Sequence, residues 1–391
     1  MAHRIGILTL LRHRNPGTYF QALGTYQALR EAFADSTIEF IDVMPRPIPT
    51  VGRRDLRQMV GSFQYTRFVW SYRKAWTSLP HSRERIITNE PQAAAQFVQD
   101  LNYDVVVLGS DVVLKIVGDE CARKVPPIFW LPPLRRTLKV MLASSCDNTR
   151  LSDIAPQLRV ILSASACSFT SCYVRDDVTR QLLIDLGVDA GRLSLVPDPA
   201  FALNVPAGVI AQSRETFTQR VGSIQRPVLG VNLGEEQADW KDDLVGKLKA
   251  DGYHLVALRQ YPGVQYLGRI SPWEWAGIFP CFDQVLTYSF HETVFCLKQG
   301  VPVVNIAATK RIIELESGWS KGRYLLQQFG LNEACCLDAY GKNQATTQYM
   351  REVVLRVRDR FDCEAARDRA AELGHIYRKC VTALKAATQA N

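Results

Sequence analysis

Short apolar runs that alternate with helix-type segments are the feature that most restricts the fold of this 391-residue chain. Residues 104–108, 138–143, 228–232 and 284–288 are too short for helices and are mostly apolar. Strands of this type are buried on both faces, as in parallel sheets covered by helices. The alternation therefore predicts an α/β fold built from doubly wound β-α-β units.

Two stretches, residues 204–225 and the insertion 45–89, depart from this alternation. Residues 204–225 include a polar run and no strand pattern, which places a domain boundary there. Two doubly wound lobes predict a central cleft between the carboxyl edges of two sheets, where such folds bind ligands. The predicted parts are an N-terminal lobe over 1–205 with an insertion over 45–89, a second lobe over 222–335, and closing helices over 340–391 that pack on the lobes. The insertion shows no strand-like run, so we expect helices in it.

Composition and motifs exclude several classes of protein. The net charge of +8 is modest for this length and does not indicate a nucleic-acid partner. The ten cysteines are scattered in apolar settings without zinc spacing, so we expect reduced thiols. The start of the chain lacks a signal-peptide pattern, and no apolar run reaches about eighteen residues, which predicts a cytoplasmic protein. Neither a G-x-G-x-x-G after the first strand nor a P-loop is present, which disfavours dinucleotide and ATP chemistry.

The stretch 282–310 is the strongest candidate for a site. A strand runs into a helix that Ser289 caps, with Glu292 three residues later as in a capping box. His291 falls at the helix amino end, and Lys310 follows the next strand, on the same edge of the sheet. Backbone N–H groups and the helix dipole favour an anion at this point. The alternative is that His291 only caps the helix and Lys310 is a solvated loop charge.

Polar residues also follow strands of the first lobe. Ser110 and Asp111 come directly after residues 104–108, and Arg175 follows the strand 172–174. Arg175 opens a helix, where a cation is unfavourable unless something negative compensates it. That partner is either one of its acidic neighbours, Asp176 and Asp177, or a ligand.

Basic and aromatic residues crowd the insertion. Such a mixture suits phosphate groups or an anionic membrane surface. The alternative is a solvated helical face above a core stripe of aromatic side chains, and the residues alone leave both open. The set comprises Arg53, Arg54, Arg57, Arg67, Arg73, Lys74, Arg83 and Arg85, with Phe63, Tyr65, Phe68, Trp70, Tyr72 and Trp76.

Five motifs, in order, resemble the polysaccharide pyruvyl transferase family. Each motif is weak alone, and the ordered set, which covers about Ile5 to Lys310, is specific. The motifs are N-P-G-T-Y-F-Q-A-L-G-T-Y-Q-A-L (15–29), Y-D-V-V-V-L-G-S-D (103–111), Y-V-R-D-D-V-T-R-Q-L-L-I-D-L-G (173–187), V-P-D-P-A-F (196–201) and T-Y-S-F-H-E-T-V-F-C-L-K-Q-G-V-P-V-V (287–304). The resemblance implies two Rossmann-like lobes in a GT-B-like fold.

The resemblance also implies an activity. Members of the family transfer the enolpyruvyl unit of phosphoenolpyruvate onto sugar hydroxyls as a cyclic ketal, so we expect this co-substrate and neither a cofactor nor a metal. The family's motif residues fall on Arg175, His291 and Lys310. Arg175 would clamp the phosphate or carboxylate, Lys310 would neutralise the departing phosphate, and His291 would act as acid or base. Asp111 is a further candidate for accepting the hydroxyl proton. The expected substrate-binding residues are Asn15, Gly17, Ser110, Ser289, Glu292 and Arg259.

The family's acceptors are often lipid-linked sugars, so the resemblance also implies a saccharide acceptor at the inner membrane face. We therefore expect the basic and aromatic insertion, with Trp70 and Trp76, to make peripheral membrane contact.

Departures from the family pattern leave two rival functions open. Pro16 stands where an aromatic residue is common, Val112-Val113 follows the Gly-Ser-Asp motif, and Glu292 stands where Gly is common. A carboxylate beside an anion site repels the substrate unless it points away. One rival is a glycosyltransferase that binds a nucleotide sugar, with Glu235 or Glu236 on the ribose. The other is a catalytically idle member of the family that binds glycans.

Overall fold

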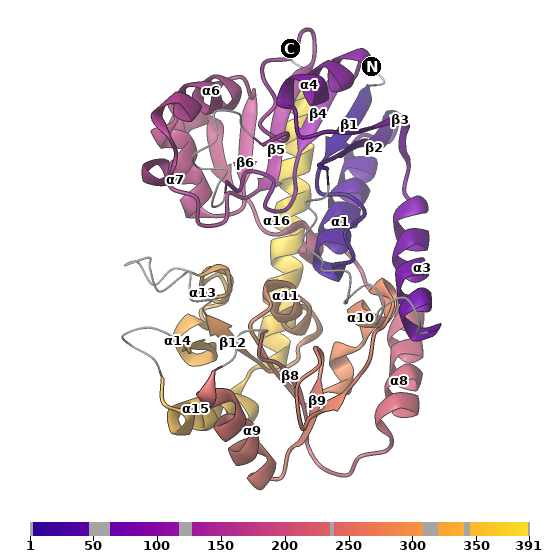
Figure 1. The fold of residues 1–391 in the computed structure, drawn as a ribbon, viewed down its shortest axis with the longest axis vertical. Helices are drawn as coiled ribbons and strands as arrows, with labels where there is room; N and C mark the ends of the chain where they lie inside the picture. The colour runs from indigo at the N-terminus through magenta and orange to yellow at the C-terminus, as the bar shows by residue number, and fades with distance from the viewer. Residues whose placement is uncertain are drawn as a thin grey trace. The chain divides into compact units, whose positions relative to one another are not determined.

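The computed structural model describes residues 3–46, 63–116, 127–234, 238–307, 320–339 and 345–389 (Figure 1). The chain divides into two compact units. Unit 1 comprises residues 1–203 and 373–391, and unit 2 comprises residues 204–372. Several residues of the sequence-based predictions lie outside the described ones: Lys310, Glu235, Glu236, Arg53, Arg54 and Arg57.

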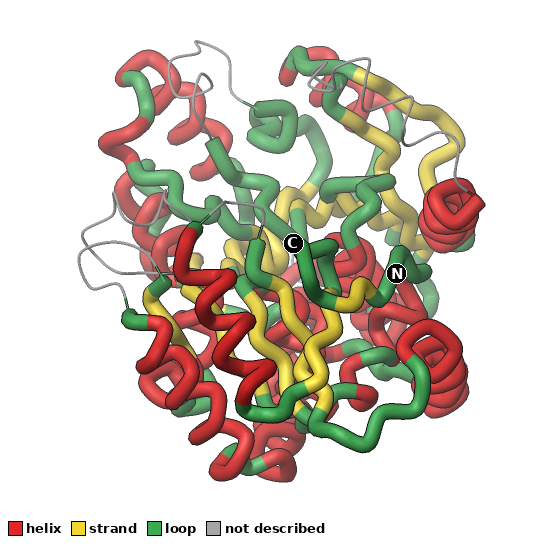
Figure 2. Tube along the Cα trace, turned by 60° about the horizontal axis from the view of Figure 1, so that its bottom comes forward, coloured by secondary structure: helices red, strands yellow, loops and turns green. Residues whose placement is uncertain are grey.

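Unit 1 is built on a parallel sheet with the strand order β3-β2-β1-β4-β5-β6-β7. Figure 2 shows strands running side by side among helices. The strands are β1 (Arg4–Leu8), β2 (Thr37–Met44), β3 (His81–Ile87), β4 (Val105–Leu108), β5 (Leu138–Ser144), β6 (Ser171–Val174) and β7 (Leu193–Leu195). The helices include α1 (Pro16–Ala32), α3 (Phe63–Thr77), α4 (Pro91–Asp100), α6 (Pro156–Cys167), α7 (Asp177–Asp185) and the 3-10 turn η3 (Pro199–Ala202).

The inner strands of this sheet are the ones that the sequence predicts best. β4 reads Val-Val-Val-Leu, and all its side chains are buried. It pairs with β1 on one side, with Ile5 opposite Val105, and with β5 on the other. Leu108, Met141 and Leu162 of α6 belong to one core cluster. The apolar runs are therefore explained by burial between helices on both faces.

The prediction that the insertion 45–89 lacks a strand is wrong. Residues 81–87 form β3, which pairs in parallel with β2 at the edge of the sheet. Its sequence, His-Ser-Arg-Glu-Arg-Ile-Ile, is polar because an edge strand is partly exposed, and charged residues there discourage pairing with other chains. The predicted helix in the insertion is present as α3.

Unit 2 is also built on a parallel sheet, in the order β10-β9-β8-β11-β12-β13. Its strands are β8 (Val228–Asn232), β9 (His254–Ala257), β10 (Gln265–Tyr266), β11 (Gln284–Thr287), β12 (Val303–Ala307) and β13 (Cys336–Asp338). The helices are α8 (Ala207–Val221), α9 (Asp239–Ala250), α10 (Pro272–Gly277), α11 (Phe290–Gln299), α13 (Lys321–Gln327), α14 (Asn332–Cys335) and α15 (Thr347–Arg360) among the described residues.

The boundaries of the units differ from the predicted ones in two places. The polar segment at 207–221 forms α8, which buries Ser213 and Phe217 and belongs to unit 2, so that unit starts at 204 and not at 222. The last helix, α16 (Cys363–Gln389), contributes to both units, since residues up to 372 belong to unit 2 and those from 373 to unit 1.

The carboxyl-terminal part of α16 is a full member of unit 1. Leu373, Tyr377 and Val381 are buried in it. The Tyr377 hydroxyl donates to Thr25 Oγ1 of α1 at 3.2 Å. Lys385 Nζ donates to the carbonyl oxygen of Ala32 at 2.8 Å, at the end of the same helix. These contacts show that α16 packs along α1.

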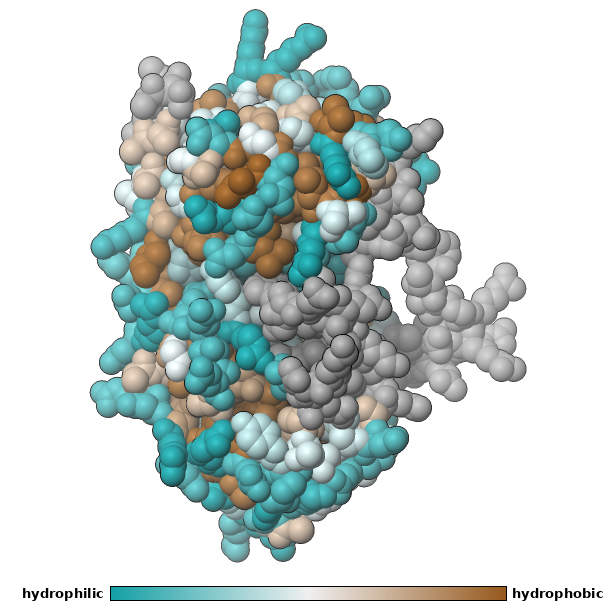
Figure 3. All heavy atoms as spheres, turned by 90° about the vertical axis from the view of Figure 1, so that its left-hand side faces the viewer, coloured by the Kyte–Doolittle hydropathy of each residue, from teal (hydrophilic) through white to brown (hydrophobic). Residues whose placement is uncertain are grey.

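The cysteines and the surface of the described residues can be compared with the sequence-based predictions. The nine described cysteines are free thiols, as predicted, and only Cys167 is exposed. No described helix combines the length and apolar character needed to cross a membrane. Figure 3 shows apolar residues gathered on the upper part of one face. On α6, Val160 and Ile161 are 71% and 43% exposed.

Candidate functional site

Unit 1 has a topological switch point between β1 and β4. After β1 the chain continues to β2 and β3 on one side of the sheet, whereas β4 starts the series on the other side. The carboxyl ends of β1 and β4 therefore meet where doubly wound folds place ligands. Thr9 follows β1, and its hydroxyl donates to the carbonyl oxygen of Ser110 at 2.9 Å. This edge is the first candidate site.

The structure brings the predicted residues Asn15, Gly17, Ser110 and Asp111 to this edge. Asn15 caps α1, because its Oδ1 accepts from the Gly17 N–H at 2.8 Å. Asp111 is buried, and its Oδ2 accepts from the Thr18 hydroxyl in the first turn of the same helix at 2.8 Å. The other oxygen accepts from the Val112 N–H at 2.8 Å. Asp111 is therefore fixed against the amino end of α1.

Arg175 lies in a buried cluster of acidic residues. It is 5% exposed, and its Nη1 donates to Asp198 Oδ2 at 3.1 Å. Gln21 Nε2 of α1 donates to the same oxygen at 2.5 Å. The predicted alternative, pairing with Asp176, does not describe the ion pair, because Asp176 caps α7 through the Thr179 N–H and accepts from the Ser145 hydroxyl.

The charges of this cluster explain how a cation is kept at the start of a helix. Burial lowers the pKa of the Arg175 guanidinium, but Asp198, Asp111 and Asp176 outweigh it and leave the pKa above its usual value. Three carboxylates thus surround one guanidinium, and each of the three side chains is buried. Arg175 has a structural partner that the sequence analysis did not name. Its predicted role as a substrate clamp stays a prediction.

Unit 2 has a matching switch point between β8 and β11. β8 leads to β9 and β10 on one side, and β11 leads to β12 and β13 on the other. Asn232 ends β8 and pairs in register with Thr287, which ends β11. Both side chains are buried and point to one acceptor: Asn232 Nδ2 donates to Glu292 Oε1 at 2.8 Å, and the Thr287 hydroxyl donates to Glu292 Oε2 at 2.5 Å.

The start of α11 differs in one respect from the predicted capping box. Ser289 does cap the helix, because its hydroxyl accepts from the Glu292 N–H at 3.5 Å. The reciprocal bond is absent, since the Ser289 N–H donates to Thr287 Oγ1 at 2.8 Å. The Glu292 side chain instead binds Asn232 and Thr287, so it fixes the helix to two strands. The prediction of a complete capping box is therefore wrong.

The environment of Glu292 decides how it affects the site. The side chain is 6% exposed. Burial raises the pKa of Glu292, and the hydrogen bonds from Thr287 and Asn232 and the charge of Arg259 oppose that rise. The carboxylate thus faces the interior of unit 2 and its two hydrogen-bond donors. It does not stand on the exposed side of the helix end.

The remaining predicted residues of this edge are partly exposed. His291 is half-buried in the first turn of α11, with its ring edge-on to Phe290 at 5.1 Å between centroids. Arg259 follows β9 and is exposed, and its Nη1 donates to the Tyr288 hydroxyl at 2.8 Å. Ser289, His291 and Arg259 therefore share the carboxyl edge of this sheet. The expectation for Lys310 concerns a position outside the described residues.

Sequence reasoning missed five residues that organise the two edges: Thr18, Gln21, Asp198, Asn232 and Thr287. Four of them lie in the quoted motifs, and Asn232 ends a predicted strand. Their positions in the sequence could therefore have identified them as candidates. The partners of Thr18, Gln21 and Asn232 could not be predicted, because each of these pairs is distant in sequence. Among the described residues, no group of three or more His, Cys, Asp or Glu side chains is arranged to hold a metal ion.

Comparisons with known structures identify the fold. The chain is similar to S. aureus MnaA in complex with UDP, with 9% identity, a TM-score of 0.55 and coverage of 99% of this chain and 97% of that one. It is also similar to the UDP-GlcNAc 2-epimerase from Methanocaldococcus jannaschii, with 10% identity, a TM-score of 0.56 and coverage of 98% and 99%. These likenesses confirm the predicted GT-B-like fold with two parallel α/β sheets.

A comparison by sequence identifies the family. No curated protein matches the chain. The model of the family described as "Polysaccharide pyruvyl transferase" matches residues 15–309, which is more than half of the 391 residues. That span contains all five motifs and the switch point of unit 2 described above, so the chain belongs to the polysaccharide pyruvyl transferase family.

Proposed function

We propose that this protein transfers the enolpyruvyl unit of phosphoenolpyruvate to two hydroxyls of a saccharide, forming a pyruvate ketal and releasing phosphate. Family membership supports a transferase of this general type. The observation that carries the proposal is the orientation of Glu292. Its carboxylate is held between Asn232 and Thr287 inside unit 2, so it does not oppose an anion at the end of α11.

The amino end of α11 is the proposed anion site. The helix is ten residues long and is capped by Ser289. N–H groups of a first helical turn point out of the helix end and favour negative charge. Arg259 adds a cation on the same edge of the sheet. We assign the phosphate or the carboxylate of phosphoenolpyruvate to this edge. The role of Lys310 as a further cation stays a prediction from the sequence.

The reaction requires two carbon–oxygen bonds to form and one to break. A proton is added to the methylene carbon, and one acceptor hydroxyl attacks C2 and loses its proton. The C2–O bond to phosphate then breaks, phosphate leaves with its electron pair, and a second hydroxyl attacks C2 and loses its proton. His291 is the proposed group that donates or accepts these protons, because imidazole changes charge near neutral pH. Asp111 stays the second candidate for the proton of an acceptor hydroxyl.

We propose that Arg175 binds the substrate while it also keeps its structural ion pair with Asp198. The ion pair with Asp198 keeps a guanidinium beside Asp111 in an acidic setting. A lysine carries the same charge but cannot form two parallel hydrogen bonds to a carboxylate or a phosphate. Arg175→Lys should therefore retain the fold and lose most transfer activity. Near-normal turnover in a folded Arg175→Lys variant would contradict a clamp role.

The deciding experiment measures phosphate release from phosphoenolpyruvate with a panel of saccharide acceptors, with the acceptor product examined by mass spectrometry. We expect acceptor-dependent phosphate release and a pyruvate ketal on the acceptor. His291→Gln and His291→Ala should each lower the rate by roughly 10²- to 10⁴-fold, as removal of a general acid or base does. Phosphate release without an acceptor, or full activity of both variants with an unchanged pH–rate profile, would refute the assignment.

Two rival hypotheses are tested by the same protein. A glycosyltransferase that uses a nucleotide sugar shares this fold, but the likeness to UDP-binding structures supports the fold alone. A catalytically idle member would bind glycan without turnover. Titration calorimetry with phosphoenolpyruvate and, separately, with UDP-glucose distinguishes the three. Binding of UDP-glucose without phosphoenolpyruvate binding favours the first rival, and binding of neither favours the second.

A further inference from the structure

Helix α3 has two faces of opposite character. On one face, Tyr72 and Trp76 are 2% and 1% exposed. The Trp76 indole N–H donates to the carbonyl oxygen of His13 at 2.9 Å, and its ring packs edge-on against Tyr19 at 5.3 Å between centroids. This face belongs to the core. The expectation that Trp76 touches a membrane is therefore wrong, because its ring is buried in unit 1.

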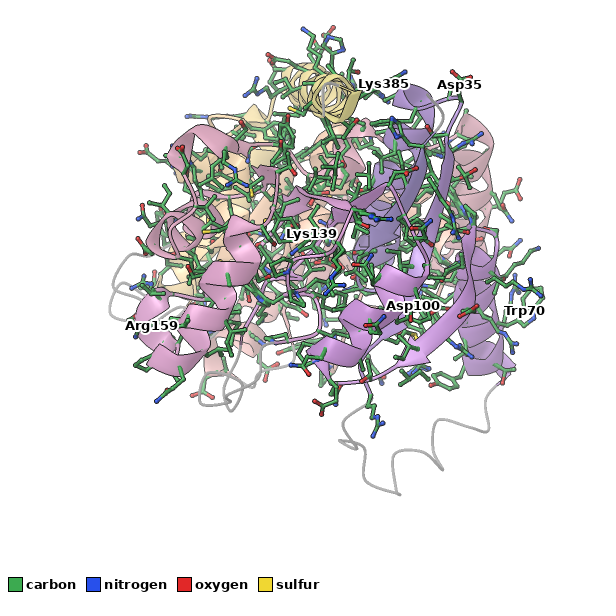
Figure 4. All side chains as sticks on the ribbon, turned by 90° about the horizontal axis from the view of Figure 1, so that it is seen from above. Asp35, Trp70, Asp100, Lys139, Arg159 and Lys385 are labelled. Atoms are coloured by element: carbon green, nitrogen blue, oxygen red, sulfur yellow. The ribbon has the colours of Figure 1, made fainter. Side chains whose placement is uncertain are left out.

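The opposite face of α3 carries cations around one exposed indole. Trp70 is 60% exposed, and Figure 4 shows its side chain pointing away from the molecule. Lys74 Nζ lies 5.5 Å from the centre of the Trp70 ring. Arg67 and Arg73 stand three residues on either side of Trp70, at the spacing of one helical face, and both are exposed. We name Arg67, Trp70, Arg73 and Lys74 the basic face of α3.

Charge and anchoring distinguish this face from a random surface. Helix α3 contains no acidic residue, so the three cations are not neutralised by their own helix. Its buried residues hold it on the loop that leads to α1. Besides Trp76, Tyr65 accepts a hydrogen bond at 2.6 Å from Arg14, the residue before the α1 cap. The basic face is thus part of a helix that is anchored to the residues around the start of α1.

We propose that the basic face of α3 docks the protein on an anionic phospholipid surface. Indole rings prefer the boundary between lipid headgroups and hydrocarbon, where one edge is wet and the rest is apolar. Lys and Arg near such a surface are attracted by its negative potential. The exposed apolar pair on α6, Val160 and Ile161, offers apolar area without this cluster of cations. It therefore serves as a comparison surface.

The test is co-sedimentation of the full chain with two kinds of vesicle, phosphatidylcholine alone and phosphatidylcholine mixed with phosphatidylglycerol. We expect binding to the mixed vesicles at low salt, little binding to the neutral ones, and release at high salt. Replacing Arg67, Arg73 and Lys74 together by Gln should weaken binding on the order of a hundredfold, at about fivefold per cation. Trp70→Ala should weaken it roughly tenfold, through lost apolar burial.

Matched controls separate the basic face from net charge and exposed area. Replacing Arg356, Arg360 and Lys379 by Gln removes the same charge from exposed positions of α15 and α16. Val160→Ala removes exposed apolar area from α6. Both controls should bind vesicles as the unchanged protein does. Thermal unfolding of every variant confirms that the fold is intact, and none of these residues belongs to the proposed site.

Two results would overturn the proposal. One is equal loss of binding in the α3 triple variant and in the α15 and α16 control, because binding would then follow net charge alone. The other is that the unchanged protein shows no salt-dependent binding to mixed vesicles. Binding of single-stranded RNA without binding of these vesicles would count as this second result. The readout does not involve phosphoenolpyruvate, so its outcome is independent of the proposed transferase activity.

Discussion

Removing the Arg175 guanidinium should destabilise unit 1 strongly. Arg175→Met preserves most of the side-chain volume but leaves Asp198, Asp111 and Asp176 without their buried cation. Breaking a buried ion pair by removing one partner costs about 3–5 kcal/mol, because a buried charge remains uncompensated. Whole domains are stable by about 5–15 kcal/mol, so a large share of the stability of unit 1 is at stake.

The measurement is urea unfolding followed by circular dichroism. A matched control is Arg358→Met, because Arg358 pairs with Asp359 at 2.8 Å on the surface, with side chains 36% and 60% exposed. Exposed pairs of this kind contribute about 0–1 kcal/mol, so the control should change the free energy of unfolding little.

The two roles of Arg175 predict different results. A free energy of unfolding within about 1 kcal/mol of the unchanged protein, with phosphoenolpyruvate binding lost, would refute the structural argument and favour a substrate clamp. Asp198→Asn gives an independent check, since it removes the partner and keeps the guanidinium.

Three further predictions concern single residues. Glu292→Gln should leave the free energy of unfolding unchanged below pH 4.5, the ordinary pKa of this carboxyl. As the pH rises above that value, the variant should become increasingly more stable than the unchanged protein, because the folded state binds the proton of Glu292 more tightly than the unfolded state does. Urea unfolding as a function of pH measures this, and a gain in stability at acidic pH would contradict it. Gly24→Ala should lower the free energy of unfolding by about 1–3 kcal/mol, since its Cβ would lie 2.4 Å from the carbonyl oxygen of Pro199. Gly246→Ala, with open space around it, should instead stabilise α9 by about 0.5–1 kcal/mol. Equal effects of the two substitutions in thermal unfolding would refute the contact at Gly24. Lys139→Met should lower the free energy of unfolding by about 1–3 kcal/mol, because the buried ammonium donates to Ser168 Oγ and to the carbonyl oxygen of Leu131 at 2.6 Å each. An unchanged free energy of unfolding would show that these acceptors find other donors.

The inner layers of both sheets were predictable from the sequence, and the edges were not. Strands such as β4 and β8 are buried on both faces, so burial fixes their apolar composition. Edge strands face solvent and carry no such requirement, which explains why the polar β3 and the two-residue β10 were missed. Helix α8 was missed because only Ser213 and Phe217 of its residues are buried.

The candidate sites were predictable in position but not in contacts. Each predicted residue followed a strand or opened a helix, and β-α topology brings such residues to one edge. The partners come from distant segments: Asp198 lies 23 residues from Arg175, and Asn232 lies 60 residues from Glu292. Local patterns predicted a capping box for Glu292. The same spacing is compatible with a capping box and with the observed arrangement, in which the Glu292 side chain binds Asn232 and Thr287. The tertiary contacts with Asn232 and Thr287 determine which one forms.

The course of α16 affects how the protein folds during its synthesis. Residues 1–203 leave the ribosome first, but unit 1 also contains residues from 373 onward. Until these emerge, the side of α1 that receives Tyr377 and Lys385 has no partner from α16. Unit 2 is then translated in full while unit 1 is still incomplete. A nascent chain stopped before Leu373 should therefore expose apolar surface of unit 1 and bind a holdase chaperone until the last helix docks.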